Sequence, residues 1–286
     1  MHKWRIAQFG LIYGLGMRCT ENRGMHFLIS PAKTLDYERS LPTPVLTRPR
    51  FLADSAELID VLKPKTQGEI AELMDLSAPL ASLNVERYAA WSNRFTAANS
   101  KPAMLAFNGD VYEGLNAPTL SQDDLAWAQD HVSILSGLYG LLRPLDRMQP
   151  YRLEMGTALA TARGKNLYEF WGDTLVRQLN RQLAGSTPKI IVNLASQEYF
   201  RAVQRKTLKA RVIECVFEDW KSSAAGGSYK VISFFAKRAR GLMLRHAIDR
   251  RLTAPEGLVK FKSEGYRFES AVSEPDRLVF RRRIED

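Results

Sequence analysis

The sequence has few of the residues that hold disulfide-rich folds or metal sites together. Its 286 residues include two cysteines, Cys19 and Cys215, and four histidines that stand singly along the chain. Two cysteines exclude a disulfide framework and a four-cysteine zinc site, and they are typical of a reducing compartment. Because no His-x-x-x-His pair is present, a histidine-rich metal site is not expected either.

Long apolar runs and familiar catalytic motifs are also missing. No stretch is long enough to cross a membrane, and no Gly-x-Ser-x-Gly motif, P-loop or Cys/His arrangement stands out. These absences favour a cytoplasmic protein that has no cofactor and no metal. They give no support to any known class of enzyme.

Positive charge is abundant and unevenly distributed. The net charge is +10, and residues 201–252 hold thirteen Lys or Arg against four Asp or Glu, a local excess of +9. Clustered positive charge is what a phosphate-binding surface requires, so a polyanionic partner is expected. Charge alone leaves a second interpretation open, in which the protein is only basic and soluble.

The first 24 residues differ from the rest of the chain. They are basic and dotted with glycine, and their short apolar run, Phe9–Leu15, lacks the small-x-small cleavage site of a signal peptide. Met25 then opens directly into the apolar run Phe27–Ile29. We therefore interpret residues 1–24 as a disordered extension or a misassigned start, and residues 25–286 as one domain.

The remaining sequence predicts a mixed α/β fold in a single compact domain. Hydrophobic residues make up 45% of the chain, enough for a substantial core, and short β-type runs alternate with helical stretches. The expected strands are Phe27–Ile29, Ala103–Phe107, Ile190–Leu194, Val212–Phe217, Tyr229–Phe235, Tyr266–Phe268 and Leu278–Arg281. The expected helices are Phe51–Leu62, Gln67–Leu76, Val85–Phe95, Ser121–Ser136, Leu167–Leu183 and Ala236–Leu252.

Two local patterns refine this prediction. Ser121 and Asp124 have the spacing of a capping box at a helix start, with Asp in place of the usual Glu or Gln. The small polar segment Ser222–Ser228 predicts a long, mobile loop that joins two strands into a hairpin.

The helix expected at Ala236–Leu252 combines an apolar face with a basic one. Lys237, Arg238 and Arg245 lie on the basic side, around Gly241. A glycine costs a helix roughly 1 kcal/mol relative to alanine, and here it would leave a flat spot where a bulky anion approaches the backbone. The alternative is a solvated basic face with an incidental glycine.

The apolar face of the same helix holds Ala239, Leu242, Met243, His246 and Ala247, so His246 is interpreted as a packed histidine. Leu244 and Ile248 fall off that face, which indicates contacts on more than one side.

The segment Gln67–Phe95 resembles a helix-hairpin-helix, a motif that binds DNA without reading bases. Two helical stretches are expected to meet at Leu80–Val85, where backbone N–H groups at the start of the second helix would face a phosphate. Ser82 and Asn84 stand where the motif usually has glycine, so an ordinary helix–helix turn is the alternative. The candidate residues of this hairpin are Ser82, Leu83, Asn84, Val85 and Arg87.

A third segment, in the middle of the chain, interleaves charged residues with apolar ones. Arg143 and Arg152 each have an acidic neighbour, Asp146 and Glu154 respectively. Charges in such surroundings must be paired or line a cleft, so structural ion pairs and a functional site are both open. Lys33 lies on a loop after the first strand. It is only a weak indication of phosphate binding, because the loop lacks the glycines of a P-loop.

Several motifs resemble signatures of the YaaA family. They are Ser30–Tyr37, Ala106–Tyr112, Leu135–Gly140, Arg143–Asp146, Gln149–Gly156, Asn193–Ser196 and Phe235–Gly241. The resemblance runs from Met25 almost to the C-terminus. It implies a single α/β domain of unusual topology, with a basic cleft and a helix-hairpin-helix that binds DNA. It also implies induction under peroxide stress and protection against iron-linked oxidative damage, and it names no defined enzyme.

Together, the residues and the resemblance predict a sequence-nonspecific DNA-binding protein of the peroxide stress response. It would contact the phosphate backbone of duplex or branched DNA, and a role in repair or recombination is open. The candidate DNA-binding residues are Lys33, Ser82, Leu83, Asn84, Val85, Arg87, Arg143, Arg152, Lys237, Arg238, Arg240, Gly241 and Arg245.

Two other functions remain open. One is an iron-sequestering protein, which is disfavoured because the sequence does not cluster His and carboxylate ligands. The other is an uncharacterised enzyme, which a compact, deep polar pocket would favour, whereas an open cleft wide enough for a duplex would favour DNA binding. That pocket would lie around Lys33, Arg143, Arg152 and Asn193, with Asp110, Tyr112, Tyr151 and Glu154.

Overall fold

The computed structural model describes residues 24–38, 46–204, 206–223 and 226–283. Its central sheet is built from β1 (Met25–Ile29), β5 (Val132–Ser136), β6 (Gly140–Leu142), β8 (Ile190–Leu194), β9 (Arg211–Ser223), β10 (Gly226–Lys230), β11 (Arg267–Phe268) and β12 (Arg277–Arg282). The strand order is β11-β12-β9-β8-β1-β5-β6, and β10 also pairs with β9. Neighbours from β12 to β5 run parallel, whereas β6, β10 and β11 join antiparallel.

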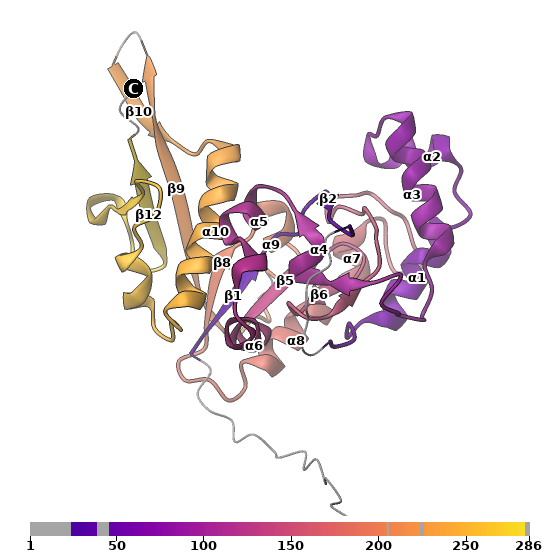
Figure 1. Ribbon diagram of the computed structural model, residues 1–286, viewed down its shortest axis with the longest axis horizontal. Coiled ribbons are helices and arrows are strands. Elements are labelled where there is room, and N and C mark those ends of the chain that lie inside the picture. Colours follow the sequence, from indigo (N-terminus) through magenta and orange to yellow (C-terminus); the bar gives the residue numbers. More distant parts are fainter. Residues whose placement is uncertain (1–23, 39–45, 205, 224–225, 284–286) are drawn as a thin grey trace, which may run out of the picture.

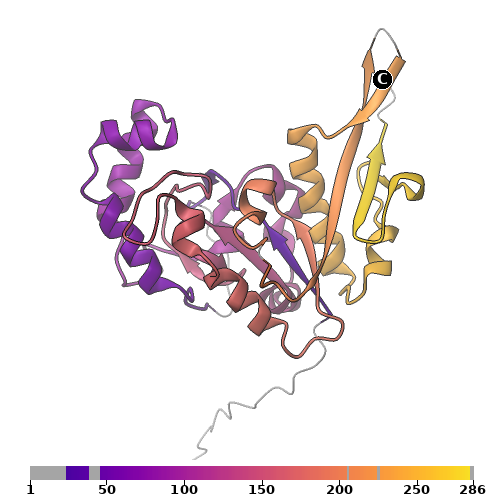
Figure 2. The ribbon, with the colours of Figure 1, turned by 180° about the vertical axis from the view of Figure 1, so that it is seen from behind.

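The three central strands are buried on both faces. β1 reads MHFLI, β5 reads VSILS and β8 reads IIVNL, and every residue in them is buried. Such continuous apolar runs are typical of parallel strands that helices cover on both sides. One side carries α5 (Asp110–Leu115), α6 (Gln122–His131) and α10 (Ser233–Asp249), and the other carries α7 (Leu167–Trp171), α8 (Thr174–Gln182) and α9 (Gln197–Phe200) (Figure 1, Figure 2). The mixed α/β class is confirmed.

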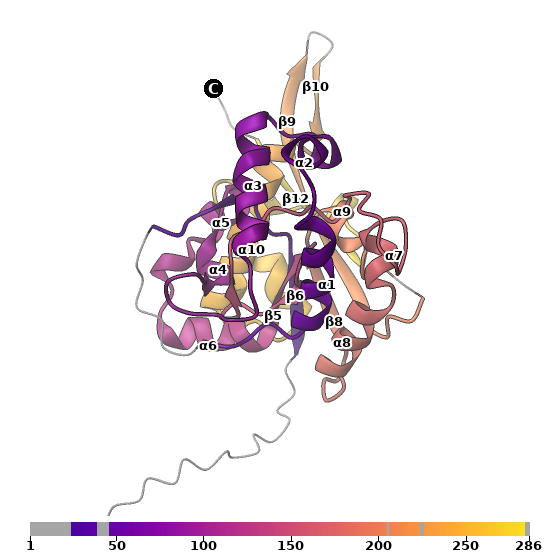
Figure 3. The ribbon, with the colours of Figure 1, turned by 90° about the vertical axis from the view of Figure 1, so that its right-hand side faces the viewer.

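Two parts of the chain rise beyond the edge at which β1 and β8 end (Figure 1, Figure 3). One is the helix pair α2 (Gln67–Met74) and α3 (Ala78–Ala90), which follows α1 (Leu52–Leu62). The other is the hairpin of β9 and β10. The molecule therefore has a V-shaped outline, with the carboxyl ends of the central strands at its base. The remaining elements are β2 (Thr34–Leu35), β3 (Lys101–Pro102), α4 (Ala103–Ala106), β4 (Phe107–Asn108), β7 (Arg147–Met148) and the short 3-10 helices Ala117–Thr119, Pro255–Lys260 and Ser270–Val272.

Two stretches that are predicted from apolar runs differ in the structure. The strand expected at Ala103–Phe107 is wrong, because its first four residues form α4. The helix expected at Ser121–Ser136 ends at His131, and its last five residues are the buried strand β5. Its start is confirmed, since Ser121 and Asp124 form the predicted capping box. Short apolar runs fit a buried helix or a buried strand equally well, so tertiary packing decides between them.

Other predicted boundaries move for local reasons. Gly172, whose φ of 44° lies in the left-handed region, divides the helix expected at Leu167–Leu183 into α7 and α8. The predicted long loop between β9 and β10 is wrong, because the ladder continues to the pair Gly226↔Ser223. The strand expected at Tyr229–Phe235 ends at Lys230, and α10 begins soon after it.

α10 is packed on more than one side, as its sequence predicts. Leu244 and Ile248 lie off the predicted apolar face, and both are fully buried. The His246 ring packs edge-on against Phe261, and its Nε2 lies 3.1 Å from the carbonyl oxygen of Gly257. Burial lowers the pKa of His246, which is the behaviour of a packed histidine.

Gly241 lies where α10 crosses α5, and its interpretation as a flat spot for an anion is wrong. A Cβ atom at Gly241 would lie 1.8 Å from the carbonyl oxygen of Val111. On the facing helix, a Cβ atom at Gly114 would lie 2.2 Å from the carbonyl oxygen of Arg238. The two glycines therefore let the helix backbones touch, and α5 occupies the space that the anion would need.

The cysteine within the described ranges is inaccessible. Cys215 lies on β9 with 3% of its surface exposed, and burial raises the pKa of its thiol to about 12. Cys19 and residues 1–23, most of the predicted extension, lie outside the described ranges. Within those ranges, every helix falls short of the length and apolar character that crossing a membrane requires.

The glycine crossing can be tested with a matched pair of alanine variants. Gly241→Ala should lower the free energy of unfolding by about 3 kcal/mol or more, because its methyl group meets backbone that cannot rotate away. Gly68→Ala should raise stability by up to about 1 kcal/mol, since it lies in α2 with no atom within 4 Å of the added methyl group. Urea unfolding followed by circular dichroism measures both. Similar values for the two variants would contradict the close crossing.

Candidate functional site

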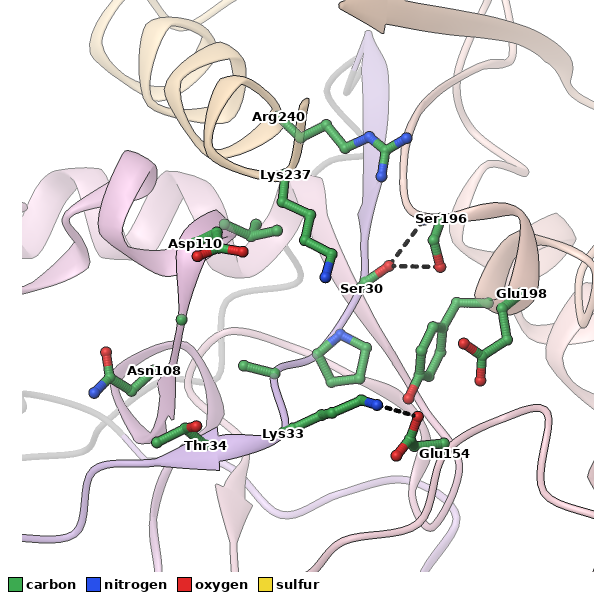
Figure 4. A pocket seen from close by; sticks show the side chains of 15 residues that line it. Ser30, Lys33, Thr34, Asn108, Asp110, Glu154, Ser196, Glu198, Lys237 and Arg240 are labelled. Carbon is green, nitrogen blue, oxygen red and sulfur yellow. Dashed lines mark hydrogen bonds and ion pairs between the residues drawn. The ribbon is translucent and has the colours of Figure 1, made fainter. Parts of the chain in front are cut away.

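A pocket of about 420 Å³ opens where β1 and β8 end, at the base of the V (Figure 4). In the sheet, β5 lies on one side of β1 and β8 lies on the other, so the order of the strands reverses at β1. Ligands of parallel α/β sheets bind outside the carboxyl ends of the strands, at such a switch point. The pocket is lined by Ser30, Pro31, Ala32, Lys33, Thr34, Asn108, Gly109, Asp110, Val111, Glu154, Ser196, Glu198, Tyr199, Lys237 and Arg240.

Two serines tie the loops that follow β1 and β8. Ser30 Oγ accepts a hydrogen bond from the backbone N–H of Ser196 (2.9 Å) and lies 3.4 Å from its Oγ. Beneath them, the Tyr112 hydroxyl donates to the carbonyl oxygen of Ser30 (3.0 Å). Asn193 Oδ1 accepts from the N–H of Ala195 (3.0 Å), which shapes the loop after β8. These bonds hold both serine side chains at the floor of the pocket.

One wall of the pocket carries a chain of paired charges. Lys33 Nζ lies 2.9 Å from Glu154 Oε2, and Arg152 Nη2 lies 3.1 Å from Glu154 Oε1. Nearby, Glu198 accepts a hydrogen bond from the N–H of Gly156 (2.8 Å). Both carboxylates on this wall are therefore already engaged by the protein's own donors.

Two cations on α10 project into the pocket without such partners (Figure 4). Lys237 and Arg240 are one turn apart, and neither forms a hydrogen bond or an ion pair with any residue that the structure describes. Desolvation lowers the pKa of Arg240, while Glu214 and Cys215 raise it by a smaller amount. A desolvated guanidinium without a carboxylate in ion-pair contact favours an anionic ligand.

A third unpaired cation lies toward the helix pair. Arg87 of α3 is half-buried, and its pKa is lowered chiefly by desolvation and also by the charge of Arg152. The described ranges contain no ion pair or hydrogen bond to its side chain. Tyr88, next along α3, donates to the carbonyl oxygen of Arg152. We call the series Arg87, Arg152, Lys33, Lys237 and Arg240, which links α3 to the pocket, the basic track.

Three predicted DNA-binding arginines lie elsewhere and are held by acidic partners. Arg143 contacts Asp146 through Nε (3.1 Å) and Nη2 (2.8 Å), and that carboxylate is fully buried. Arg238 contacts Glu264 at 3.0 and 2.6 Å. Arg245 Nε lies 2.7 Å from Asp249 Oδ1, and its Nη1 lies 2.6 Å from Thr119 Oγ1. For Arg143 the alternative of a structural ion pair therefore describes the geometry, and Arg238 and Arg245 are paired in the same way.

The predicted helix–helix turn at Leu80–Val85 is wrong. Ala78–Ala90 is one continuous helix, so Ser82, Leu83, Asn84 and Val85 lie in its middle, where the backbone N–H groups bond within the helix. Asn84 is fully buried, and its side chain donates to the carbonyl oxygen of Leu80 (2.7 Å). The turn between α2 and α3 lies earlier, at residues 75–77, where Asp75 adopts the left-handed conformation with φ 49°.

The enzyme alternative is only partly assembled. Lys33 and Glu154 line the pocket and Arg152 contacts it through Glu154, but Arg143 is not among the lining residues. Asn193 lines a neighbouring hollow instead. Sequence reasoning did not select Ser30, Ser196 or Glu198, although both serines closely follow a buried strand. Across the described ranges, no three His, Cys, Asp or Glu side chains gather as a metal ion would require.

The structural role of Arg143 gives a direct prediction. Arg143→Ala should lower the free energy of unfolding by about 3 kcal/mol, because it leaves the buried carboxylate of Asp146 without its ion pair. Arg211→Ala is the control: its pair with Asp276 is largely exposed, so the loss should stay below about 1 kcal/mol. Urea titrations of both variants provide the comparison. Two small, equal losses would return Arg143 to the list of ligand-binding candidates.

Comparison with known proteins places this sequence in a family. The sequence matches the family described as peroxide stress protein YaaA over residues 25–272. It is 61% identical over 260 residues to a UPF0246 protein of Paracidovorax citrulli, covering 91% of this chain and 99% of the relative. It is equally identical over 259 residues to a UPF0246 protein of Bordetella petrii, covering 91% of this chain and 100% of the relative. The chain therefore belongs to the YaaA family of peroxide stress proteins, which assigns it a role in the stress response.

Proposed function

We propose that this stress protein binds DNA through the phosphate backbone, without reading base sequence, along the basic track. The observation that supports the proposal best is the state of three cations. Arg87, Lys237 and Arg240 are without ion pairs in the part of the chain that the structure describes, whereas Arg143, Arg238 and Arg245 each contact a carboxylate. Cations that the fold does not neutralise are available to an external polyanion.

The physical gain from phosphate contact is large at these positions. The charged guanidinium groups of Arg87 and Arg240 are partly removed from water by the fold, and this desolvation lowers their pKa values. A phosphate would offset that cost through charge-assisted hydrogen bonds, and each neutralised phosphate would release counterions from the DNA. The net charge of +10 would also accelerate the encounter.

The two projections extend the surface that DNA would meet. On the hairpin, Lys221 and Lys230 are exposed on either side of the cross-strand pair Trp220–Tyr229. On the other projection, Ser77 precedes the first residue of α3, and its side chain forms no capping hydrogen bond. We infer that a helix-hairpin-helix contact uses the turn at residues 75–77, where the N–H groups of Ala78 and Leu80 lie in the first turn of α3; Pro79 between them has none.

DNA binding would also account for a role in the stress response. A protein that covers the phosphate backbone under peroxide stress would limit iron-linked damage to the DNA. Preference for branched over linear duplex would point to repair or recombination, and equal binding would point to protection alone.

Binding through the phosphate backbone should depend strongly on salt concentration. If the three unpaired cations of the basic track and the cations of the two projections together neutralise about five phosphates, the logarithm of the binding constant should fall against the logarithm of salt concentration. The slope should be near −4.5, taking about −0.9 per contact. Fluorescence anisotropy with duplexes of unrelated sequence measures the slope. A flat response, or strong preference for one sequence, would refute backbone binding.

Removing two unpaired cations of the basic track should show where DNA binds. The double variant Arg87→Gln/Lys237→Gln should reduce the steepness of the slope by about 1.8, since two phosphate contacts are lost. Its control is Arg177→Gln/Arg181→Gln, on exposed positions of α8 at the opposite end of the sheet (Figure 1). The control should keep the slope of the unmodified protein. If both double variants change the slope equally, binding is spread over the surface and the basic track has no special role.

A further inference from the structure

The pocket at the base of the V has a charge pattern that a DNA backbone alone does not explain. Three cations and three carboxylates line it, so it is not simply a positive hollow. Two of the carboxylates, Glu154 and Glu198, accept contacts from Lys33, Arg152 and a backbone N–H. Among the lining residues that the structure describes, the charged side chains with neither an ion pair nor a hydrogen bond are Lys237, Arg240 and Asp110. The ligand that suits the pocket must satisfy two positive groups and one negative group together.

The two cations and the two serines can hold one phosphate group. In Figure 4 the guanidinium of Arg240 extends toward Ser196, and the ammonium of Lys237 points toward Ser30. Ser196 Oγ receives a weak contact from Ser30 and donates its own proton to no described residue. Guanidinium, ammonium and hydroxyl donors around one point are the groups that bind phosphate oxygens. Two positive charges match a dianion, which a phosphate monoester provides and a backbone diester does not.

The remaining lining residues suit a ligand body rich in hydroxyl or amino groups. Asp110, at the start of α5, lies beside Lys237 on the opposite wall from Ser196 (Figure 4). Asn108 and Thr34 continue this side of the pocket. A carboxylate, an amide and a hydroxyl accept hydrogen bonds from sugar hydroxyls or from an exocyclic amino group. A volume of about 420 Å³ lies in the range that encloses one small ligand.

We propose that this pocket binds the phosphate monoester of a nucleoside, with the phosphate on Lys237, Arg240, Ser30 and Ser196 and the sugar or base toward Asp110 and Asn108. The ligand has two possible sources, a free nucleoside monophosphate or the phosphorylated end of a DNA strand. The strand-end form rests on the DNA binding proposed above, and the free-nucleotide form does not.

Calorimetric titration with adenosine monophosphate, adenosine and inorganic phosphate tests the pocket itself. The unmodified protein should bind the monophosphate, bind inorganic phosphate more weakly and show no binding of adenosine. Arg240→Gln should weaken the monophosphate by about tenfold or more, because it removes a charge-assisted contact. Lys237→Gln, at an exposed position that cannot disturb the core, should weaken it as well, and Arg177→Gln should leave it unchanged. Equal binding of adenosine and its monophosphate, or undiminished binding by both pocket variants, overturns the proposal.

Three forms of one DNA duplex separate the two sources: a closed dumbbell without ends, a duplex with 5′-hydroxyl ends and a duplex with 5′-phosphate ends. A preference for the phosphorylated ends that Arg240→Gln removes identifies the strand end as the ligand. Monophosphate binding without that preference identifies the free nucleotide. If the protein does not bind adenosine monophosphate and does not prefer the phosphorylated ends, the pocket proposal is overturned, even where the dumbbell binds. Failure of the dumbbell to bind refutes only the backbone function, so the two failures are distinguishable.

Discussion

The backbone contact between α5 and α10 determines where the walls of the pocket stand. Gly114 and Gly241 bring the two helices to a separation that no larger residue permits. α5 begins at Asp110 and α10 carries Lys237 and Arg240, so one crossing places the acidic and the basic groups on facing walls. Because α10 also packs on β8 and β9, this pair of helices is fixed relative to the strand ends that carry Ser30 and Ser196.

Neighbouring arginines of α10 have different roles because their surroundings differ. Arg238 and Arg240 are two residues apart on one helix, yet the first contacts Glu264 and the second faces the pocket without a carboxylate in contact. An ion pair within the fold contributes to stability and leaves little charge for a ligand. A guanidinium that the fold desolvates without neutralising lowers the stability of the folded protein. Such a group is tolerated where a bound ligand offsets the loss.

The sequence predicts the class of fold and two of the three central strands, β1 and β8, whereas it predicts β5 as the end of a helix and predicts the state of its charges poorly. The strand at Ile190–Leu194 agrees with its prediction at both ends, because five consecutive residues are buried on both faces. The partner of Arg238 is not readable in the same way, since Glu264 comes from a distant segment that only the fold brings near. The interpretation of Gly241 fails for a related reason, as its partner Gly114 lies on another helix. The predicted hairpin turn lies too late in the chain because Ser82 and Asn84, which disfavour helix interiors, are helical here.

The surroundings of Cys215 have a consequence for a protein that works under oxidant. Peroxide attacks the thiolate form of cysteine and needs access to the sulfur. Cys215 offers neither, since its surface is 3% exposed and its thiol has a pKa of about 12. The fold therefore shields this sulfur from peroxide, and the cysteine that lies within β9 is kept out of the oxidant chemistry that exposed thiolates undergo.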